Sequence, residues 1–184
     1  MKKGYTLIIF LLISLISYGQ SKVNFVITPN CTYTSKDTDK SFYVFDYKGH
    51  SKQELFNKAA SVFTKIFAKK DDQINKTDNS ILSVNTNYIL HSSAYLNWSK
   101  EYIYFDEYIK YNIEFEFKDG KIKVNAPTLI QIRDNDGIEH PLGYFILSGD
   151  NEAVLANGAI EQFSFVNKVI NKILTNIDTT MVDW

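Results

Sequence analysis

The sequence contains one cysteine, Cys31, among its 184 residues. A single cysteine cannot form an internal disulfide, so the fold must be held by a hydrophobic core instead of cross-links. The sequence also has no internal repeat and no low-complexity tract. A disulfide scaffold and a repeat architecture are therefore excluded. We interpret Cys31 as an ordinary small side chain; a reactive or intermolecular thiol is the alternative.

The sequence has no excess of positive charge. It carries 20 Lys and Arg residues against 21 Asp and Glu residues. Removal of residues 1–19 would take away Lys2 and Lys3 and no acid, which leaves 18 basic against 21 acidic residues and a formal charge of −3. Proteins that bind nucleic acids neutralise phosphates with Lys and Arg, so no nucleic-acid partner is expected.

The sequence lacks the usual catalytic and metal-binding motifs. There is no Gly-rich phosphate loop and no G-x-S-x-G elbow. The three histidines, His50, His91 and His140, are far apart and have no ligand-like spacing to a second histidine or to Cys31, so no zinc site is expected. The oxygen-rich run 134–137 with Glu139 is an incomplete calcium-loop pattern, and a solvated turn is the preferred interpretation. We therefore expect no catalytic residue, no metal and no cofactor.

The first 19 residues have the pattern of a signal peptide. Lys2 and Lys3 precede an apolar run, Leu7 to Ile16, and a small-x-small site ends at Gly19. Cleavage there would make Gln20 the first residue of an exported chain. The alternative is an uncleaved anchor, but the apolar run is short for a membrane span, which needs about 20 residues. A lipid anchor is not expected because Cys31 lies well beyond the cleavage site. The expected location is periplasmic, secreted or at the cell surface, with no stable membrane span after cleavage.

The predicted domain plan follows from this cleavage site. Residues 20–40 are a polar lead-in with at most one short strand, near Val23–Ile27. Residues 41–178 form one α+β domain, and residues 179–184 form a tail. The chain that remains after cleavage, Gln20–Trp184, has a length typical of a single domain.

One amphipathic helix is predicted over Ser51–Ala68. Ser51 and Glu54 have the spacing of a capping box, in which the hydroxyl accepts from an early amide and the carboxylate reaches back. Gly49 allows a sharp turn before the helix. Apolar residues recur at spacings of three and four and place three phenylalanines on one side, which is best covered by a sheet: Leu55, Phe56, Ala59, Ala60, Val62, Phe63, Ile66 and Phe67.

Alternating polarity predicts an antiparallel sheet in most of the remaining chain. The expected strands are Phe42–Tyr47, Gln73–Lys76, Ile81–Leu90, Glu101–Phe117 and Lys121–Arg133. Turns are expected at Asp78-Asn79 and at Asp119-Gly120. His91–Lys100 is expected to be a looser connection and Asp134–Gly149 a loop.

The last strand and the C-terminal helix complete the predicted core. In Lys121–Arg133 the core-facing residues are expected to be Ile122, Val124, Ala126, Ile130 and Ile132, with a bulge or an edge position at Pro127. A helix starting at Asn151 or, preferably, at Gly158 continues to Ile177, with Asn167 and Lys168 on its outer side. The result is a two-layer α+β domain, with a curved antiparallel sheet of about five strands and two helices on one face.

Several short motifs resemble those of a family of exported Bacteroidetes proteins of unknown function. The run Lys48-Gly49-His50-Ser51-Lys52-Gln53-Glu54-Leu55-Phe56 is similar to the start of that family. Ser80-Ile81-Leu82 and Asp119-Gly120-Lys121 also resemble motifs of the family. The resemblance spans Phe42–Ile177 and implies a TATA-binding-protein-like fold. It implies no catalytic residue, because the family has no assigned activity, and a fold name does not imply DNA binding.

The outward side of the sheet is the predicted interaction surface. Tyrosines of the long strand, with polar residues of neighbouring strands, offer rigid apolar area together with hydrogen-bonding groups: Tyr102, Tyr104, Tyr108, Asn85, Asn87 and Lys123. A protein, peptide or glycan partner would suit such a surface. The alternative is that residues 21–40 or 134–149 cover the tyrosines.

Three functions remain open from the sequence. The first is an exported, non-enzymatic binding or interaction module that uses the open sheet face. The second is a binding protein for a small apolar, lipid-like molecule held between sheet and helices, because that interface is rich in aromatic residues. The third and least favoured is a hydrolase that uses scattered carboxylates and His140.

Overall fold

The computed structural model describes residues 22–69, 72–96, 101–143, 147–148, 154–155 and 159–182. The expected signal peptide, residues 1–19, lies outside this part of the chain. Among the described residues, no helix has both the length and the apolar character that a membrane crossing requires.

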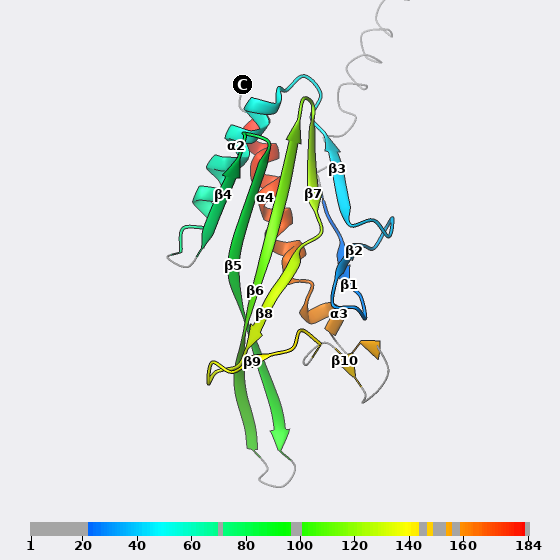
Figure 1. Cartoon of the computed structure of the whole chain (residues 1–184), viewed down its shortest axis with the longest axis vertical. Helices are drawn as coiled ribbons and strands as arrows, with labels where there is room; N and C mark the ends of the chain where they lie inside the picture. Colours follow the sequence, from blue (N-terminus) through cyan, green and yellow to red (C-terminus); the bar gives the residue numbers. More distant parts are fainter. Residues whose placement is uncertain are drawn as a thin grey trace, which may run out of the picture.

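A seven-stranded antiparallel sheet forms one layer of the molecule (Figure 1). Its main path runs β3-β7-β6-β5-β4, and β8 and β9 join beside β6. The strands are β3 (Phe42–Asp46), β4 (Gln73–Thr77), β5 (Ile81–Leu96), β6 (Glu101–Lys118), β7 (Lys121–Asn125), β8 (Thr128–Arg133) and β9 (Glu139–His140). Two further pairs, β1 (Phe25–Ile27) with β2 (Tyr33–Ser35) and β10 (Leu147–Ser148) with β11 (Val154–Leu155), are separate small sheets.

Two long helices, α2 (Lys52–Ile66) and α4 (Phe165–Val182), form the second layer on one face of the sheet (Figure 1). A short helix, α3 (Ala159–Gln162), precedes α4. The predicted two-layer α+β architecture with both helices on one face is confirmed. The sheet has more strands than the five expected, because the segment predicted as Lys121–Arg133 is divided into β7 and β8 and because β9 adds a short edge.

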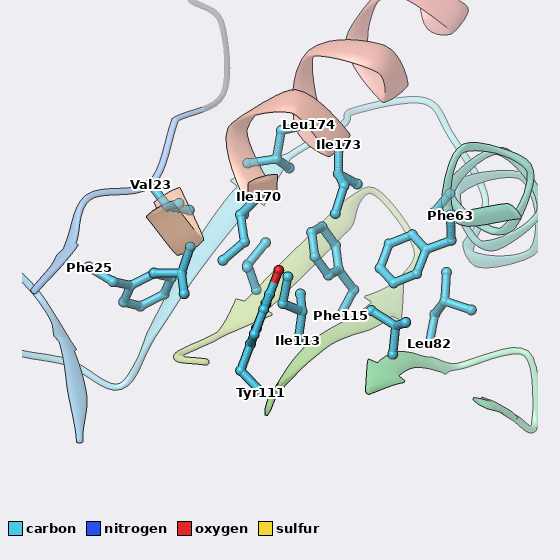
Figure 2. Close-up of a cluster of buried hydrophobic side chains, with 14 of the residues drawn as sticks. Val23, Phe25, Phe63, Leu82, Tyr111, Ile113, Phe115, Ile170, Ile173 and Leu174 are labelled. Atoms are coloured by element: carbon cyan, nitrogen blue, oxygen red, sulfur yellow. The ribbon is translucent and has the colours of Figure 1, made fainter. Parts of the chain in front are cut away.

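The core lies between the sheet and the two helices (Figure 2). Phe63 of α2 meets Phe115 of β6 edge to face, with 5.3 Å between ring centroids, and Phe56 meets Phe117 at 5.5 Å. The apolar side of α4 is equally enclosed, and Ile170 and Ile173 have no exposed surface. The phenylalanine stripe of α2 is therefore buried against Phe115 and Phe117 of β6, which confirms the prediction that a sheet covers it.

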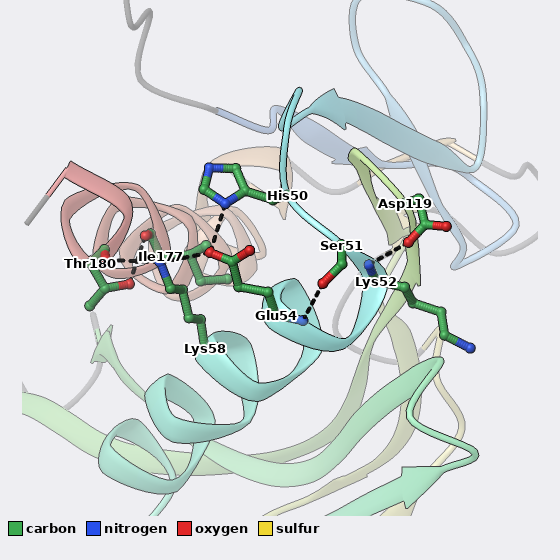
Figure 3. A network of polar contacts seen from close by, with 8 residues as sticks. All are labelled: His50, Ser51, Lys52, Glu54, Lys58, Asp119, Ile177 and Thr180. Atoms are coloured by element: carbon green, nitrogen blue, oxygen red, sulfur yellow. Dashed lines mark hydrogen bonds and ion pairs between the residues drawn. The ribbon is translucent and has the colours of Figure 1, made fainter. Parts of the chain in front are cut away.

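Contacts at the start of α2 tie the helix to the rest of the fold (Figure 3). Ser51 Oγ accepts a hydrogen bond from Glu54 N at 3.2 Å, so this half of the predicted capping box is confirmed. The Glu54 carboxylate points elsewhere, with Oε1 2.8 Å from His50 Nδ1 and 3.4 Å from Lys58 Nζ. A second cap comes from the β6–β7 turn, where Asp119 Oδ1 accepts from Lys52 N at 2.7 Å.

The break between β7 and β8 changes which residues are buried. Beyond Pro127 the strand pairs with β6 in a shifted register, with Tyr111 opposite Leu129 and Lys110 opposite Gln131. Ile130 has no partner in this register and is 43% exposed, while Leu129 is buried. The prediction that Ile130 faces the core was wrong, because simple alternation cannot be continued through a bulge. The irregularity expected at Pro127 is confirmed.

The segment before β3 is attached to α4 by two asparagines. Asn171 Oδ1 accepts from Val23 N at 2.7 Å and Asn171 Nδ2 donates to Val23 O at 3.0 Å. One helical turn earlier, Asn167 forms the same pair of bonds with Phe25 N and O, both 2.8 Å long. Asn167 was predicted on the outer side of the helix and is instead half-buried against this segment. The segment contains two short strands, where at most one was expected, and Val23 and Phe25 are buried.

The hairpin of β5 and β6 is longer than predicted. Pairing continues without a shift from Ile81↔Glu116 to Leu96↔Glu101, so 91–96 belong to a strand and not to a loose connection. The hairpin projects from the end of the sheet that lies away from α2 and α4 (Figure 1). The later of the two predicted starts for the C-terminal helix is close to the observed start of α3 at Ala159.

Candidate binding surface on the open sheet face

The face of the sheet opposite the helices carries alternate residues of β5, β6 and β7. In this register Asn85 lies opposite Asn112, and Lys123 opposite Glu116. The residues between them, such as Val84, Ile113 and Val124, are fully buried on the helix side. The structure thus places Asn85 and Lys123 on the open face, as the sequence pattern predicts.

Lys123 is occupied by structural contacts. Its Nζ lies 2.7 Å from Glu116 Oε1 and 5.1 Å from the centroid of the Phe42 ring. Asn125 Nδ2 also donates to Glu116 Oε1 at 2.8 Å. Hydrogen bonds from Lys123 and Asn125 hold the pKa of Glu116 below its usual value. This end of the open face is a network of satisfied polar groups.

Asn85 is also part of an internal contact, because Asn112 Nδ2 donates to Asn85 Oδ1 at 2.8 Å and to Val84 O at 3.3 Å. The predicted residues do not form one compact site. Tyr108 is separated from Glu116, the partner of Lys123, by eight positions of β6, which is about 27 Å of strand. The side chains of Tyr102 and Tyr104 lie outside the part that the structure describes.

A cleft of about 470 Å³ lies beside Tyr108. Asn87 and Ile89 of β5 and Arg133 of β8 line it with Tyr108, and the α2–β4 connection and the β8–β9 turn complete its wall with Lys69, Asp72, Asp134, Asn135 and Gly137. Tyr108 is 40% exposed and Ile89 is 41% exposed. Two of the predicted residues, Tyr108 and Asn87, are thus brought together in a cleft that has both apolar and polar walls.

The β8–β9 turn that borders the cleft is stabilised by Asp134. Its Oδ1 accepts from Asp136 N at 3.0 Å and from Ile138 N at 2.9 Å, and its Oδ2 lies 2.8 Å from His140 Nε2. The contact with His140 and the two amide bonds lower the pKa of Asp134. Both carboxylate oxygens are therefore used inside the turn, which agrees with the interpretation of residues 134–137 as a turn.

Sequence reasoning missed Ile89, Arg133 and Asn135 as members of this surface. Asn135 comes close to β6 because its Oδ1 accepts from Asp106 N at 3.2 Å. Neither Ile89 nor Arg133 was assigned a role from the sequence. Residues of a turn 29 positions along the chain from Asp106 cannot be paired with it from spacing alone.

Each histidine lies next to a carboxylate. His50 pairs with Glu54 at 2.8 Å, His91 with Asp106 at 2.7 Å and His140 with Asp134 at 2.8 Å. Among the residues that the structure describes, no three His, Cys, Asp or Glu side chains come together in a way that could hold a metal ion. The turn that contains His140 and Asp134 uses both groups to hold its own backbone conformation.

The aromatic residues between sheet and helices pack against one another. Tyr88 stacks on Phe165 with 3.9 Å between centroids, and Tyr111 meets the same ring at 5.1 Å. These contacts account for the aromatic content of the interface that motivated the idea of a bound apolar molecule.

Comparison with known protein families finds a match for the central part of the chain. Residues 42–129 match the family described as a domain of unknown function (DUF4468) with TBP-like fold. Over these residues the chain is similar to a DUF4468 domain. This stretch includes α2, the β5–β6 hairpin and the start of β8, so it contains both Tyr108 and the capped start of α2. The predicted resemblance is confirmed.

Solved structures support a TBP-like fold for this chain. A TBP-like protein from Parabacteroides distasonis superposes with a TM-score of 0.55 at 13% identity, covering 74% of this chain and 90% of that one. A DUF4468 family protein from Bacteroides ovatus gives a TM-score of 0.54 at 14% identity, covering 74% of this chain and 84% of that one. At this identity the likeness concerns the fold alone. A comparison with curated proteins finds no significant match.

Proposed function

We propose that this protein is an exported, non-enzymatic binding module that contacts another protein through the cleft beside Tyr108 on the open sheet face. The observation that carries the proposal is the pairing of Tyr108 with Ile89, two partly exposed apolar side chains of neighbouring strands, at the edge of a cleft of about 470 Å³. An exposed tyrosine provides rigid contact area and a hydroxyl for hydrogen bonding.

The polar groups around Tyr108 favour a polypeptide partner. Asn87 offers an amide donor and acceptor, while Asn135 and Arg133 keep further donors beside their contacts with Asp106 N and Gln131 Oε1. A central aromatic residue with a polar surround is the usual arrangement of a protein interface. Elsewhere on the sheet, α2 and α4 cover one face, and Lys123 at the other end of the open face is internally paired.

A photo-crosslinking amino acid at position 108 tests this proposal in the cells that produce the protein. We expect one dominant adduct between the chain and a different protein. The control position is Val44, which lies on the same face, opposite Lys123, and is 48% exposed. Absence of an adduct at position 108, or the same adduct from position 44, would contradict the proposal.

Export is proposed from the sequence of the first 19 residues. A basic start, an apolar run and a small-x-small site are the features on which signal peptidases act. The location and the cleavage site are tested by the mass measurement described in the Discussion.

A further inference from the structure

Strand β5 has one edge without a neighbouring strand over its second half. β4 pairs only with Ile81–Asn85, whereas β5 continues to Leu96 and pairs with β6 over its whole length. Within the described part of the chain, no strand pairs with the other side of Asn87–Leu96. Figure 1 shows β4 ending part-way along β5 while the hairpin continues beyond it.

The register shows which backbone groups point to this free edge. Phe117 N donates to Ser80 O at 2.8 Å, and the pairing continues from Ile81↔Glu116 to Leu96↔Glu101 without a shift. Hydrogen-bonded and non-hydrogen-bonded pairs alternate in an antiparallel ladder, so the even-numbered residues of β5 bond to β6. The odd-numbered residues direct N–H and C=O groups outward: Asn87, Ile89, His91, Ser93 and Tyr95.

This edge lacks the usual protection against strand pairing. Exposed edges commonly carry Lys, other charged residues, Pro or a bulge. The run 79–99 contains no Asp, Glu, Lys, Arg or Pro, and the β5–β6 register has no bulge. Asn87, Ile89 and His91 are exposed. The other edge strands differ, because β4 contains Lys76 and β3 contains Asp46.

We propose that the free edge of β5 pairs, antiparallel, with the same edge of a second copy of this chain across a two-fold axis. Two copies present identical uncharged runs to each other, so no like charges are brought together. The edge of β6 beyond β8 is less open, because Asp106 N donates to Asn135 Oδ1 of the β8–β9 turn at 3.2 Å, which favours β5. Pairing would also turn a projecting two-stranded ribbon, which is marginal by itself, into a four-stranded one.

The oligomeric state of the purified chain tests the proposal first. Sedimentation equilibrium across a dilution series should give about twice the chain mass at high concentration. A single-chain mass throughout the series would overturn the proposal, including the case in which the edge binds only an extended peptide from another protein.

His91 is the central outward-facing residue of the run and allows a backbone test. His91→Pro removes the outward N–H, which an edge strand tolerates but strand addition does not. His91→Ala is the matched control, because both variants lose the contact with Asp106 and only the proline loses the N–H. We expect monomers for His91→Pro and dimers for His91→Ala. A folded His91→Pro variant that remains dimeric overturns the proposal.

A second pair of variants applies if His91→Pro loses its circular-dichroism signal. His91→Lys keeps the N–H but places two positive charges near the two-fold axis, so it should weaken the dimer; Val44→Lys, a charge added on β3, should not. Equal dimerisation of both variants contradicts β5 pairing. His91 does not line the cleft beside Tyr108, so this outcome is independent of the proposed function.

Amide hydrogen exchange identifies the edge itself. The N–H groups of Ile89 and His91 should exchange slowly in concentrated solution and fast after dilution. Those of Tyr88 and Leu90, bonded to β6, should be slow in both. A dimer in which Ile89 and His91 exchange fast at all concentrations must use another surface and would overturn the assignment.

Discussion

Single side chains fix the start of α2 in two independent ways. Ser51 caps Glu54 N and Asp119 caps Lys52 N, so two of the amides that a helix leaves without partners are satisfied. Spacing in the sequence reveals the Ser51 contact. It cannot reveal the Asp119 contact, because residues 52 and 119 are 67 positions apart and only the fold brings them together.

Ser51→Ala should lower the free energy of unfolding by about 1 kcal/mol, because one cap is lost. Urea unfolding measures the change. Ser61→Ala, at an exposed position in the middle of the same helix, is the control and should be neutral or slightly stabilising. Equal losses in both variants would mean that Ser51 has no capping role.

Glu116 should make the stability of the protein depend on pH. Its contacts with Lys123 and Asn125 lower its pKa in the folded state from 4.5. A lowered folded-state pKa means that this contribution is fully present above the unfolded pKa and is lost as the pH falls through the folded value.

Glu116→Gln should therefore flatten the fall of the melting temperature below about pH 4.5. Glu139→Gln, which removes an exposed carboxylate from β9, is the control. If the melting curves of Glu116→Gln and the unmodified protein change in parallel through this range, Glu116 does not contribute in the way described.

At the scale of elements, α4 binds the extended segment around Val23 and Phe25 through two of its side chains. Asn167 and Asn171 are one turn apart, and each binds both backbone groups of one residue, Phe25 or Val23. Side-chain amides thus replace the neighbouring strand that Val23 and Phe25 would otherwise need.

Asn167→Ala should destabilise the fold by about 1–3 kcal/mol, because two half-buried backbone groups lose their partners. Thermal unfolding measures the loss, and limited proteolysis should show faster cleavage near Phe25. Asn176→Ala is the control, since Asn176 is exposed and bonds only to the preceding turn. Resistance to cleavage equal to that of the unmodified protein would contradict this role for Asn167.

The elements were predictable where periodicity is uninterrupted. The stripe of α2 and the alternation of β6 each specify a buried face over many residues, so both long helices and the strand β6 were found from the sequence. Strand alternation failed at Ile130, because a bulge exchanges the faces. Helical periodicity failed at Asn167, because an amide can be buried when its partners are backbone groups. The continuation of β5 to Leu96 was missed since polar residues at 91–93 resemble a loop.

The candidate site was predictable only in part, for a reason of geometry. Strand parity placed Tyr108, Asn87, Asn85 and Lys123 on one face, but parity gives no distance along a strand. The cleft depends on the β8–β9 turn and on Arg133, whose positions follow from the bulge in β8.

At the scale of the whole molecule, the two faces of the sheet have different roles. The helices enclose one face with ring-to-ring contacts, and the cleft beside Tyr108 lies on the other face. The β5 edge adds a third surface, which we assign to a second copy of the chain.

Export predicts a shortened chain outside the cytoplasm. The intact mass of the protein recovered from the periplasmic or secreted fraction should correspond to a start at Gln20. Replacing Gly19 with a bulky residue, as in Gly19→Trp, should block cleavage, while Gly4→Trp should not. A recovered chain that still begins at Met1 would contradict the signal-peptide assignment.

Binding of the partner captured at position 108 tests the central claim most directly. Calorimetric titration should show that Tyr108→Ala weakens binding by about 30-fold, the effect of losing a central aromatic contact of about 2 kcal/mol. Val44→Ala, on the same face but away from the cleft, should leave the affinity unchanged. An unchanged affinity for a folded Tyr108→Ala variant would contradict the assignment of function to this cleft.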